Sequence, residues 1–310
     1  MKASVKLITV FMSALMVLGL SGCMNSAPKY DNADKYSAGD REFSEEITRV
    51  DIEWRSGSVT VSEQDGSTVS VTETCSEDLS DSKKVHTWLE GSVLHIRFSA
   101  SGETFFSSTP EKKLSVKLPK DLKLEAFDYS GSSADTSFEN ITAGAVRADS
   151  SSGGLNFTSC TADSFKLEAS SGDIKLDQKG STDSIKAETS SGKITLSAED
   201  AGEIITESSS GDQSVKSGKA GKLSTEASSG EVELHLSAMP SDLKIHTSSG
   251  DAALYLPKDA DFKGVIDTSS GEIRSDLPMS NSGSSYTCGA GTNSLSIETS
   301  SGDISVKTEG

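Results

Sequence analysis

The chain contains few of the residues from which catalytic clefts are usually built. Aromatic residues make up 5% of its 310 residues, and its only two tryptophans, Trp54 and Trp88, lie in its first third. It has no G-x-S-x-G nucleophile elbow, H-E-x-x-H zinc motif, Walker loop or EF-hand loop. Its histidines form no recognisable catalytic set; they are His86, His95, His235 and His246. We therefore predict a protein that is not an enzyme, with no catalytic residues, no metal site and no required cofactor.

Cysteine and positive charge are also scarce. None of the four cysteines belongs to a C-x-x-C pair, which argues against a zinc ribbon or a thioredoxin-like redox motif. The chain has 47 acidic residues against 29 basic ones and a formal net charge of −18. Nucleic acid is therefore not an expected partner, because its phosphates require positive charge. Basic or cation-bridged partners suit this charge better.

The first 23 residues indicate a location outside the cytoplasm. Lys2 and Lys6 precede a mostly apolar stretch over residues 7–20, which is too short to span a membrane and is typical of a secretory signal peptide. The tetrapeptide that ends at Cys23, Leu-Ser-Gly-Cys, resembles a bacterial lipobox. This resemblance implies cleavage before Cys23 and lipidation of its sulfur, so that the membrane is a partner through Cys23. An ordinary signal peptide with an incidental cysteine is the alternative.

The tripeptide Ser-Ser-Gly recurs through the second half of the chain. Successive glycines are 19 to 21 residues apart except for a last interval of 31, and a period near 20 is typical of a solenoid of stacked coils. The glycines are Gly153, Gly172, Gly192, Gly211, Gly230, Gly250, Gly271 and Gly302.

Apolar residues alternate on both sides of each glycine. They recur seven and five residues before it and two and four residues after it, with a small residue three before it. This period of two predicts strand, corner, strand, whereas a helix would scatter these residues around its cylinder. We expect the glycine to supply a positive φ at the corner, and the coils to stack in chain order about 4.8 Å apart. The prediction is an all-β parallel β-solenoid of about 20-residue coils over residues 126–310, with a degenerate first corner at Gly131.

Residues 45–125 are rich in β-strand patterns that fall out of phase with the repeat. The segment 51–61 is a solitary forerunner of the corner, with Gly57 in the place of the glycine. Solenoids need atypical terminal units to cover their open ends. The predicted organisation is a lipoprotein signal peptide over 1–22, a lipidated cysteine and flexible tether over 23–44, an irregular N-terminal cap over 45–125, and the repeats over 126–310.

Two nearly acidic columns flank the corner, four residues before each glycine and one residue after it. Lysine and arginine residues two positions before the first column share its outward face, so a solvated face of mixed charge is the favoured interpretation. An edge that weakly binds divalent cations is the alternative, because carboxylate and serine oxygens are hard ligands of the kind that calcium accepts. As a candidate binding face the columns provide Glu168, Glu188, Glu207, Glu226, Asp173, Asp212, Glu231 and Asp251.

The three cysteines after Cys23 are expected to be free thiols. Cys160 and Cys288 should lie five or six coils apart, well beyond the distance of about 7 Å between Cα atoms that a disulfide allows. Cys75 could reach Cys160 from the cap, and that pair is the only intramolecular bridge that the prediction allows.

The lipobox, the irregular β-rich N-terminal region and the repeats together resemble a bacterial family of extracytoplasmic β-solenoids named after surface adhesins. The repeats that carry the resemblance span residues 168–176, 188–196 and 298–306. It implies a lipid-anchored protein exposed at the cell surface, which acts as an adhesin-like binding or envelope scaffold protein towards an unidentified protein or cell-wall polysaccharide. Some relatives are encoded beside envelope-stress regulators, which implies a sensing role as an alternative. A carbohydrate-active enzyme that uses paired acidic residues is the remaining alternative.

Overall fold

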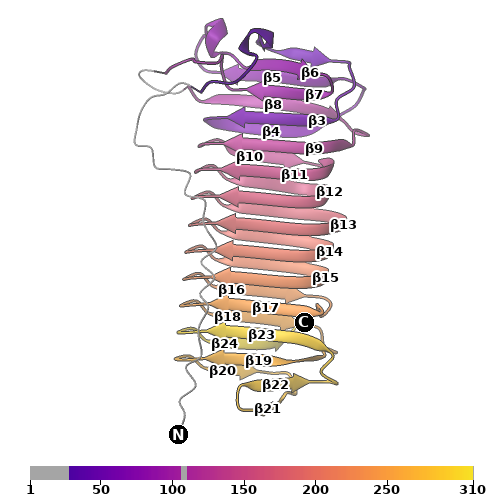
Figure 1. Cartoon of the computed structure of the whole chain (residues 1–310), viewed down its shortest axis with the longest axis vertical. Coiled ribbons are helices and arrows are strands. Elements are labelled where there is room, and N and C mark those ends of the chain that lie inside the picture. The colour runs from indigo at the N-terminus through magenta and orange to yellow at the C-terminus, as the bar shows by residue number, and fades with distance from the viewer. Residues whose placement is uncertain (1–27, 106–109, 310) are drawn as a thin grey trace.

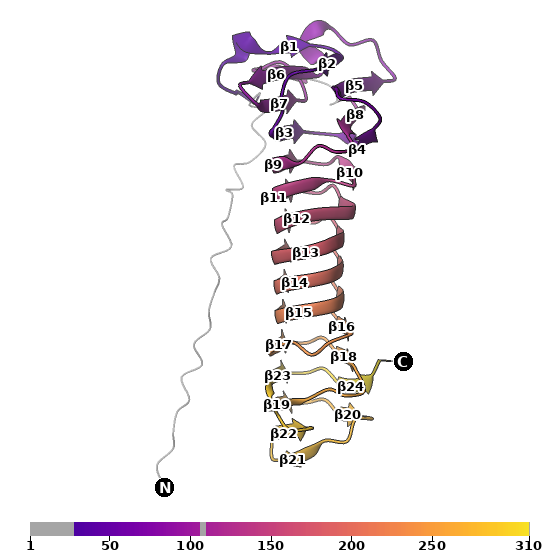
Figure 2. The same cartoon turned by 90° about the vertical axis from the view of Figure 1, so that its right-hand side faces the viewer.

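The computed structural model describes residues 28–105 and 110–309, which form an elongated stack of β-coils (Figures 1 and 2). The expected all-β, mostly parallel architecture is confirmed: the only helices among these residues are two short 3-10 turns, η1 (Ala33–Lys35) and η2 (Asp81–Lys83). No helix in the described part of the chain is long and apolar enough to cross a membrane.

Each coil contributes one strand before its corner and one after it, so the stack has two faces. Figure 2 shows them on opposite sides of the stack. The first face consists, in spatial order, of β7 (Val93–Arg97), β3 (Arg49–Trp54), β9 (Leu124–Gly131), β11 (Thr142–Ser150), the second halves of β12 to β15, β17 (Asp242–Thr247), β23 (Asn293–Thr299) and β19 (Phe262–Thr268).

The second face contains the strands that follow the corners. In spatial order it consists of β8 (Lys112–Pro119), β4 (Gly57–Gln64), β10 (Asp135–Glu139), the first halves of β12 to β15, β16 (Val232–Leu236), β18 (Ala252–Leu256), β24 (Ile304–Thr308) and β20 (Ile273–Ser275). Four central strands bend from one face to the other, namely β12 (Leu155–Ala169), β13 (Ile174–Thr189), β14 (Ile194–Ser208) and β15 (Gln213–Ala227).

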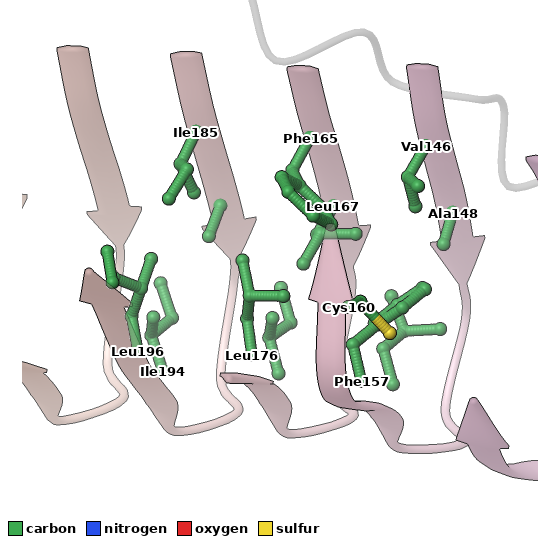
Figure 3. Packing of buried hydrophobic residues seen from close by; sticks show 14 of the residues in the cluster. Val146, Ala148, Phe157, Cys160, Phe165, Leu167, Leu176, Ile185, Ile194 and Leu196 are labelled. Carbon is green, nitrogen blue, oxygen red and sulfur yellow. The ribbon is translucent and has the colours of Figure 1, made fainter. Parts of the chain in front are cut away.

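Between the two faces runs a single narrow core. Ile185 pairs with Ile204, which pairs with Leu223, and all three side chains are almost completely buried. Figure 3 shows how Val146, Phe165 and Ile185 of the first face meet Leu176 and Leu196 of the second. The residues at the predicted inward positions of the central coils are buried except Ala169, which is half-buried, so the alternating pattern predicted their orientation correctly.

The corner glycines have a different role from the expected one. Among the described residues, no Ser-Ser-Gly glycine has a positive φ, although Gly57 does, at 89°. What each of them needs is space, because a Cβ atom would lie 1.7–2.1 Å from the carbonyl oxygen of the corner residue in the adjacent coil. The prediction of a corner at Gly131 is also wrong. Gly131 pairs with Ser150, and Ala134 occupies the corner position next to Gly153 in the adjacent coil.

The coils do not stack in chain order at either end of the solenoid, which corrects the linear arrangement expected. The coil β3–β4 lies between the coil β7–β8 and the coil β9–β10, although it precedes both in the chain. In the same way β23–β24 lies between β17–β18 and β19–β20. The 31-residue interval between Gly271 and Gly302 supplies the chain that doubles back to make this insertion possible.

Antiparallel strands flank the outermost coils, and Figure 1 shows them at the top and bottom of the stack. At one end β6 (His86–Glu90) and β1 (Ser37–Ala38) continue the first face, while β5 (Val69–Cys75) and β2 (Arg41–Phe43) continue the second. At the other end β22 (Ser285–Cys288) pairs with β19 and with β21 (Ser280–Ser282).

The segment 28–44 differs from the flexible tether predicted over residues 23–44. Phe43 is buried against the N-terminal strands, and the Tyr30 hydroxyl donates a hydrogen bond of 2.8 Å to the carbonyl of Ser99. Together with Tyr36, whose ring centroid lies 5.5 Å from that of Trp88, these aromatic side chains attach the segment to the N-terminal strands. The signal peptide and Cys23 lie outside the described residues.

The described cysteines are free thiols. Cys160 and Cys288 are buried, and Cys75 is half-buried. Burial raises the pKa of Cys160 to about 11, so this thiol is protonated at neutral pH and is a poor nucleophile.

Candidate functional site

The acidic column four residues before the corners runs along the outside of the first face. Asp149, Glu168, Glu188, Glu207 and Glu226 occupy successive paired positions in β11 to β15. The column then continues through His246, Glu298 and Asp267, in that spatial order because of the inserted coil.

Lysines neutralise only part of this column, and Glu207 is one of the members without such a partner. Lys166 contacts Glu168 at 2.9 Å, and Lys186 contacts Glu188. Burial acts to raise the pKa of Glu168, but the hydrogen bond and charge of Lys166 outweigh it, so the pKa is lowered. Glu207 has Ile205 where a lysine would stand. Burial and the neighbouring charge of Glu188 therefore raise the pKa of Glu207.

In the acidic column one residue after the corners, several carboxylates accept hydrogen bonds from the backbone of the protein itself. The carboxylates of Asp173 and Asp212 accept hydrogen bonds from the backbone N–H of the equivalent residue in the next coil, at 2.8 and 3.1 Å. Asp251 does the same for Asp303 at 2.8 Å. These aspartates therefore fasten successive corners together, whereas the column four residues before the corners has its carboxylates on the outer surface.

The histidines do not combine with the acidic columns into a metal centre. Within residues 28–105 and 110–309, no group of three or more His, Cys, Asp or Glu side chains is arranged to hold an ion. His246 belongs to the acidic column of the first face, whereas His235 lies on the second face. There His235 contacts Glu309 at 3.0 Å and stacks on Tyr255 with ring centroids 4.3 Å apart.

A small pocket at the N-terminal end of the first face was missed by sequence reasoning. It has a volume of about 290 Å³ and lies where strands β3, β7, β9 and β11 reach their corners. The N-terminal segment closes one side of it with Pro28 and Tyr30. The only signal in the sequence is the concentration of tryptophan and arginine before residue 100, which does not indicate which of these side chains meet.

Two arginines of this pocket have different surroundings. Arg97 is buried, and its guanidinium lies 2.5 Å from the carboxylate of Asp51 and 3.3 Å from that of Glu53. Arg55 is half-buried, and among the described residues its guanidinium makes no hydrogen bond and no ion pair. Asp149 also lines the pocket and accepts a hydrogen bond of 3.0 Å from the Ser130 hydroxyl.

The repeat and the stacked coils agree with a match between residues 47–307 and the sequence profile of the Toastrack family, DUF4097. The chain belongs to this family. No curated protein was found to match this Toastrack chain significantly.

Several solved structures resemble this Toastrack protein at low sequence identity. A candidate adhesin from Bacteroides fragilis is 11% identical over 66% of this chain and 95% of its own, with a TM-score of 0.35. A candidate adhesin from Parabacteroides merdae is 12% identical over 71% and 99%, with a TM-score of 0.36. A candidate lipid-binding protein from Parabacteroides distasonis is 16% identical over 88% and 97%, with a TM-score of 0.45. Similarities at this level carry no functional argument.

Proposed function

We propose that the protein is a lipid-anchored, non-catalytic β-solenoid that displays an adhesin-like binding or envelope scaffold surface outside the cell. The observation that carries the proposal is the outer surface of the first face, where a nearly continuous column of carboxylates follows the stacked strands. A rigid, repetitive surface of this kind suits an extended partner such as a protein or a cell-wall polysaccharide.

The start of the described chain supports a proposal for which end of the stack lies nearest the membrane. Five residue steps separate Cys23 from Pro28, and an extended chain of that length reaches at most about 18 Å. A lipid on Cys23 would therefore hold the antiparallel strands at the N-terminal end close to the membrane. The coils from β9 to β20 would then project away from it.

Protease treatment of intact cells tests the location. We expect external protease to remove the protein from the membrane fraction of wild-type cells, because the coils are outside the membrane. The Cys23→Ser variant should lose its membrane association while keeping the same melting temperature, since Cys23 lies outside the described coils. A wild-type protein that stays protected in intact cells and fractionates with the cytoplasm would contradict the proposal.

One observation favours a second candidate function, a carbohydrate-active enzyme. Glu207 has a raised pKa and is paired in register with Glu188, and glycosidases use a protonated acid beside an ionised carboxylate. Turnover assays across cell-wall polysaccharides separate the two functions. The non-catalytic proposal predicts no product with wild-type protein, whereas an enzyme would give product that disappears in Glu188→Gln and Glu207→Gln.

A further inference from the structure

The pocket beside Tyr30 contains a positive charge, that of Arg55, with which no described side chain forms an ion pair. Among the described residues the Arg55 guanidinium forms a cation–π contact with the Phe105 ring, whose centroid is 6.0 Å from Cζ, and no ion pair. The remaining segments, residues 1–27 and 106–109, contain no aspartate or glutamate. Burial without a compensating partner lowers the pKa of Arg55.

Among the described arginines only Arg41 and Arg55 form no ion pair, and Arg41 is exposed whereas Arg55 is half-buried. Arg49, Arg147 and Arg274 each form an ion pair with at least one carboxylate, as Arg97 does. With 47 acidic residues against 29 basic ones, an unpaired and partly buried guanidinium is a poor arrangement for stability alone. It is a good arrangement for binding an anion, because a guanidinium can bind a carboxylate through two parallel hydrogen bonds.

The rest of the pocket presents acceptors and hydroxyl groups. Glu53 and Asp149 line it together with Ser132 and Ser151, whose hydroxyls come from the corners of the first coils. Tyr30 forms a wall, held in place by its hydrogen bond to the carbonyl of Ser99. Carboxylates and serine hydroxyls suit the hydroxyl groups of a sugar, and the carboxylates would repel a ligand with two negative charges.

The size of the pocket limits the ligand further. Its volume of about 290 Å³ is at the lower end of the range of about 300–1,000 Å³ found for small-molecule sites, so it suits a single ring. We infer that this pocket binds one acidic sugar residue of a glycan, a hexuronate whose carboxylate pairs with Arg55 and whose hydroxyls meet Glu53, Asp149 and the corner serines. This inference rests on the proposed binding function and names a partner class for it.

Calorimetric titration of the detergent-purified full chain tests the inference. The probes are glucuronate, galacturonate and their short oligomers, with glucose and inorganic phosphate as comparisons. We expect saturable binding of at least one uronate and at least ten-fold weaker binding of glucose. Arg55→Gln should weaken uronate binding at least ten-fold, and Arg55→Lys should give an intermediate loss because it keeps the charge without the planar fork.

Arg49→Gln is the matched control. Arg49 begins strand β3, which ends one residue before Arg55, but it pairs with Asp128 and does not line the pocket, so uronate affinity should change less than two-fold. Thermal melts by circular dichroism establish that each variant is folded. Equal affinity for glucose and uronate, binding of phosphate alone, or full uronate affinity in folded Arg55→Gln would overturn the inference. A protein that binds uronate but stays inside the cell would contradict the proposed location while leaving the pocket intact.

Discussion

Replacing Gly153 with alanine should destabilise the solenoid although the new side chain is a single methyl group. The added Cβ would lie 2.0 Å from the carbonyl oxygen of Ala134 in the adjacent coil, whereas an ordinary contact is at least 3.4 Å. The two corners must therefore separate by more than 1 Å. That displacement strains the hydrogen bonds from Ser151 N–H to Gly131 (3.0 Å) and from Ser152 N–H to Ser132 (2.7 Å).

The size of the effect follows from these two contributions. Overpacking costs about 1–3 kcal/mol, and two weakened hydrogen bonds cost about 1 kcal/mol each. The free energy of unfolding should fall by about 3–5 kcal/mol, which corresponds to a decrease in melting temperature of about 5–9 °C for a chain of this length.

The adjacent Gly154 provides a matched control. A Cβ there would meet nothing closer than 3.7 Å, and Gly154 has no positive φ. Gly154→Ala should therefore change the free energy of unfolding by no more than about 0.5 kcal/mol. Thermal and urea unfolding of the two variants, followed by circular dichroism, measure the difference. Equal effects, or a larger effect at Gly154, would refute close stacking as the reason for the corner glycine.

Three further predictions concern the core, the acidic column and the inserted coil. Ile194→Asp should lower the free energy of unfolding by about 3–5 kcal/mol in urea titrations, because it places an unpaired charge at a fully buried position. Glu207→Gln should raise the melting temperature by relieving repulsion worth about 0.2–1 kcal/mol. Since the fold raises the pKa of Glu207, its charged form destabilises the fold, so the gain should be full above that pKa and shrink as the pH falls through it. Deleting residues 293–310 should expose residues 257–292 to limited proteolysis, because β23–β24 joins their coil to the stack; unchanged protection would contradict the insertion.

The inward and outward positions of the coils could be predicted because they depend on the period of two alone. Each strand has one buried side, so alternation identifies residues such as Ile185 and Leu196 without knowledge of their neighbours. The same pattern predicted the corner at Gly57, where β3 and β4 stack on β9 and β10.

The spatial order of the coils could not be predicted in this way. All coils have similar apolar columns, so the pattern does not specify which coil stacks on which, and the 31-residue interval indicates an irregularity without its form. The role of the corner glycines was missed for a related reason. The need for space at Gly211 arises from the backbone of Gly192 in the adjacent coil and not from the local chain conformation.

The candidate sites, too, could be predicted from the sequence only in part. Alternation predicted the two acidic columns, but only the structure shows that Asp173 and Asp212 hold neighbouring corners through backbone N–H groups. The pocket around Arg55 joins residues 28–30, 53–55, 97–99 and 130–132. The repeat relates only the corner segments among them, and stacking out of chain order brings residues 97–99 beside residues 53–55.

Incubation of the purified protein with isolated cell envelopes tests the central claim most directly, because it measures binding and turnover in one sample. The account predicts saturable retention of the protein on the envelopes, with the length of the envelope polysaccharides unchanged after prolonged incubation. Absence of saturable retention, or shortening of the polysaccharides with release of new chain ends, would contradict a non-catalytic binding solenoid.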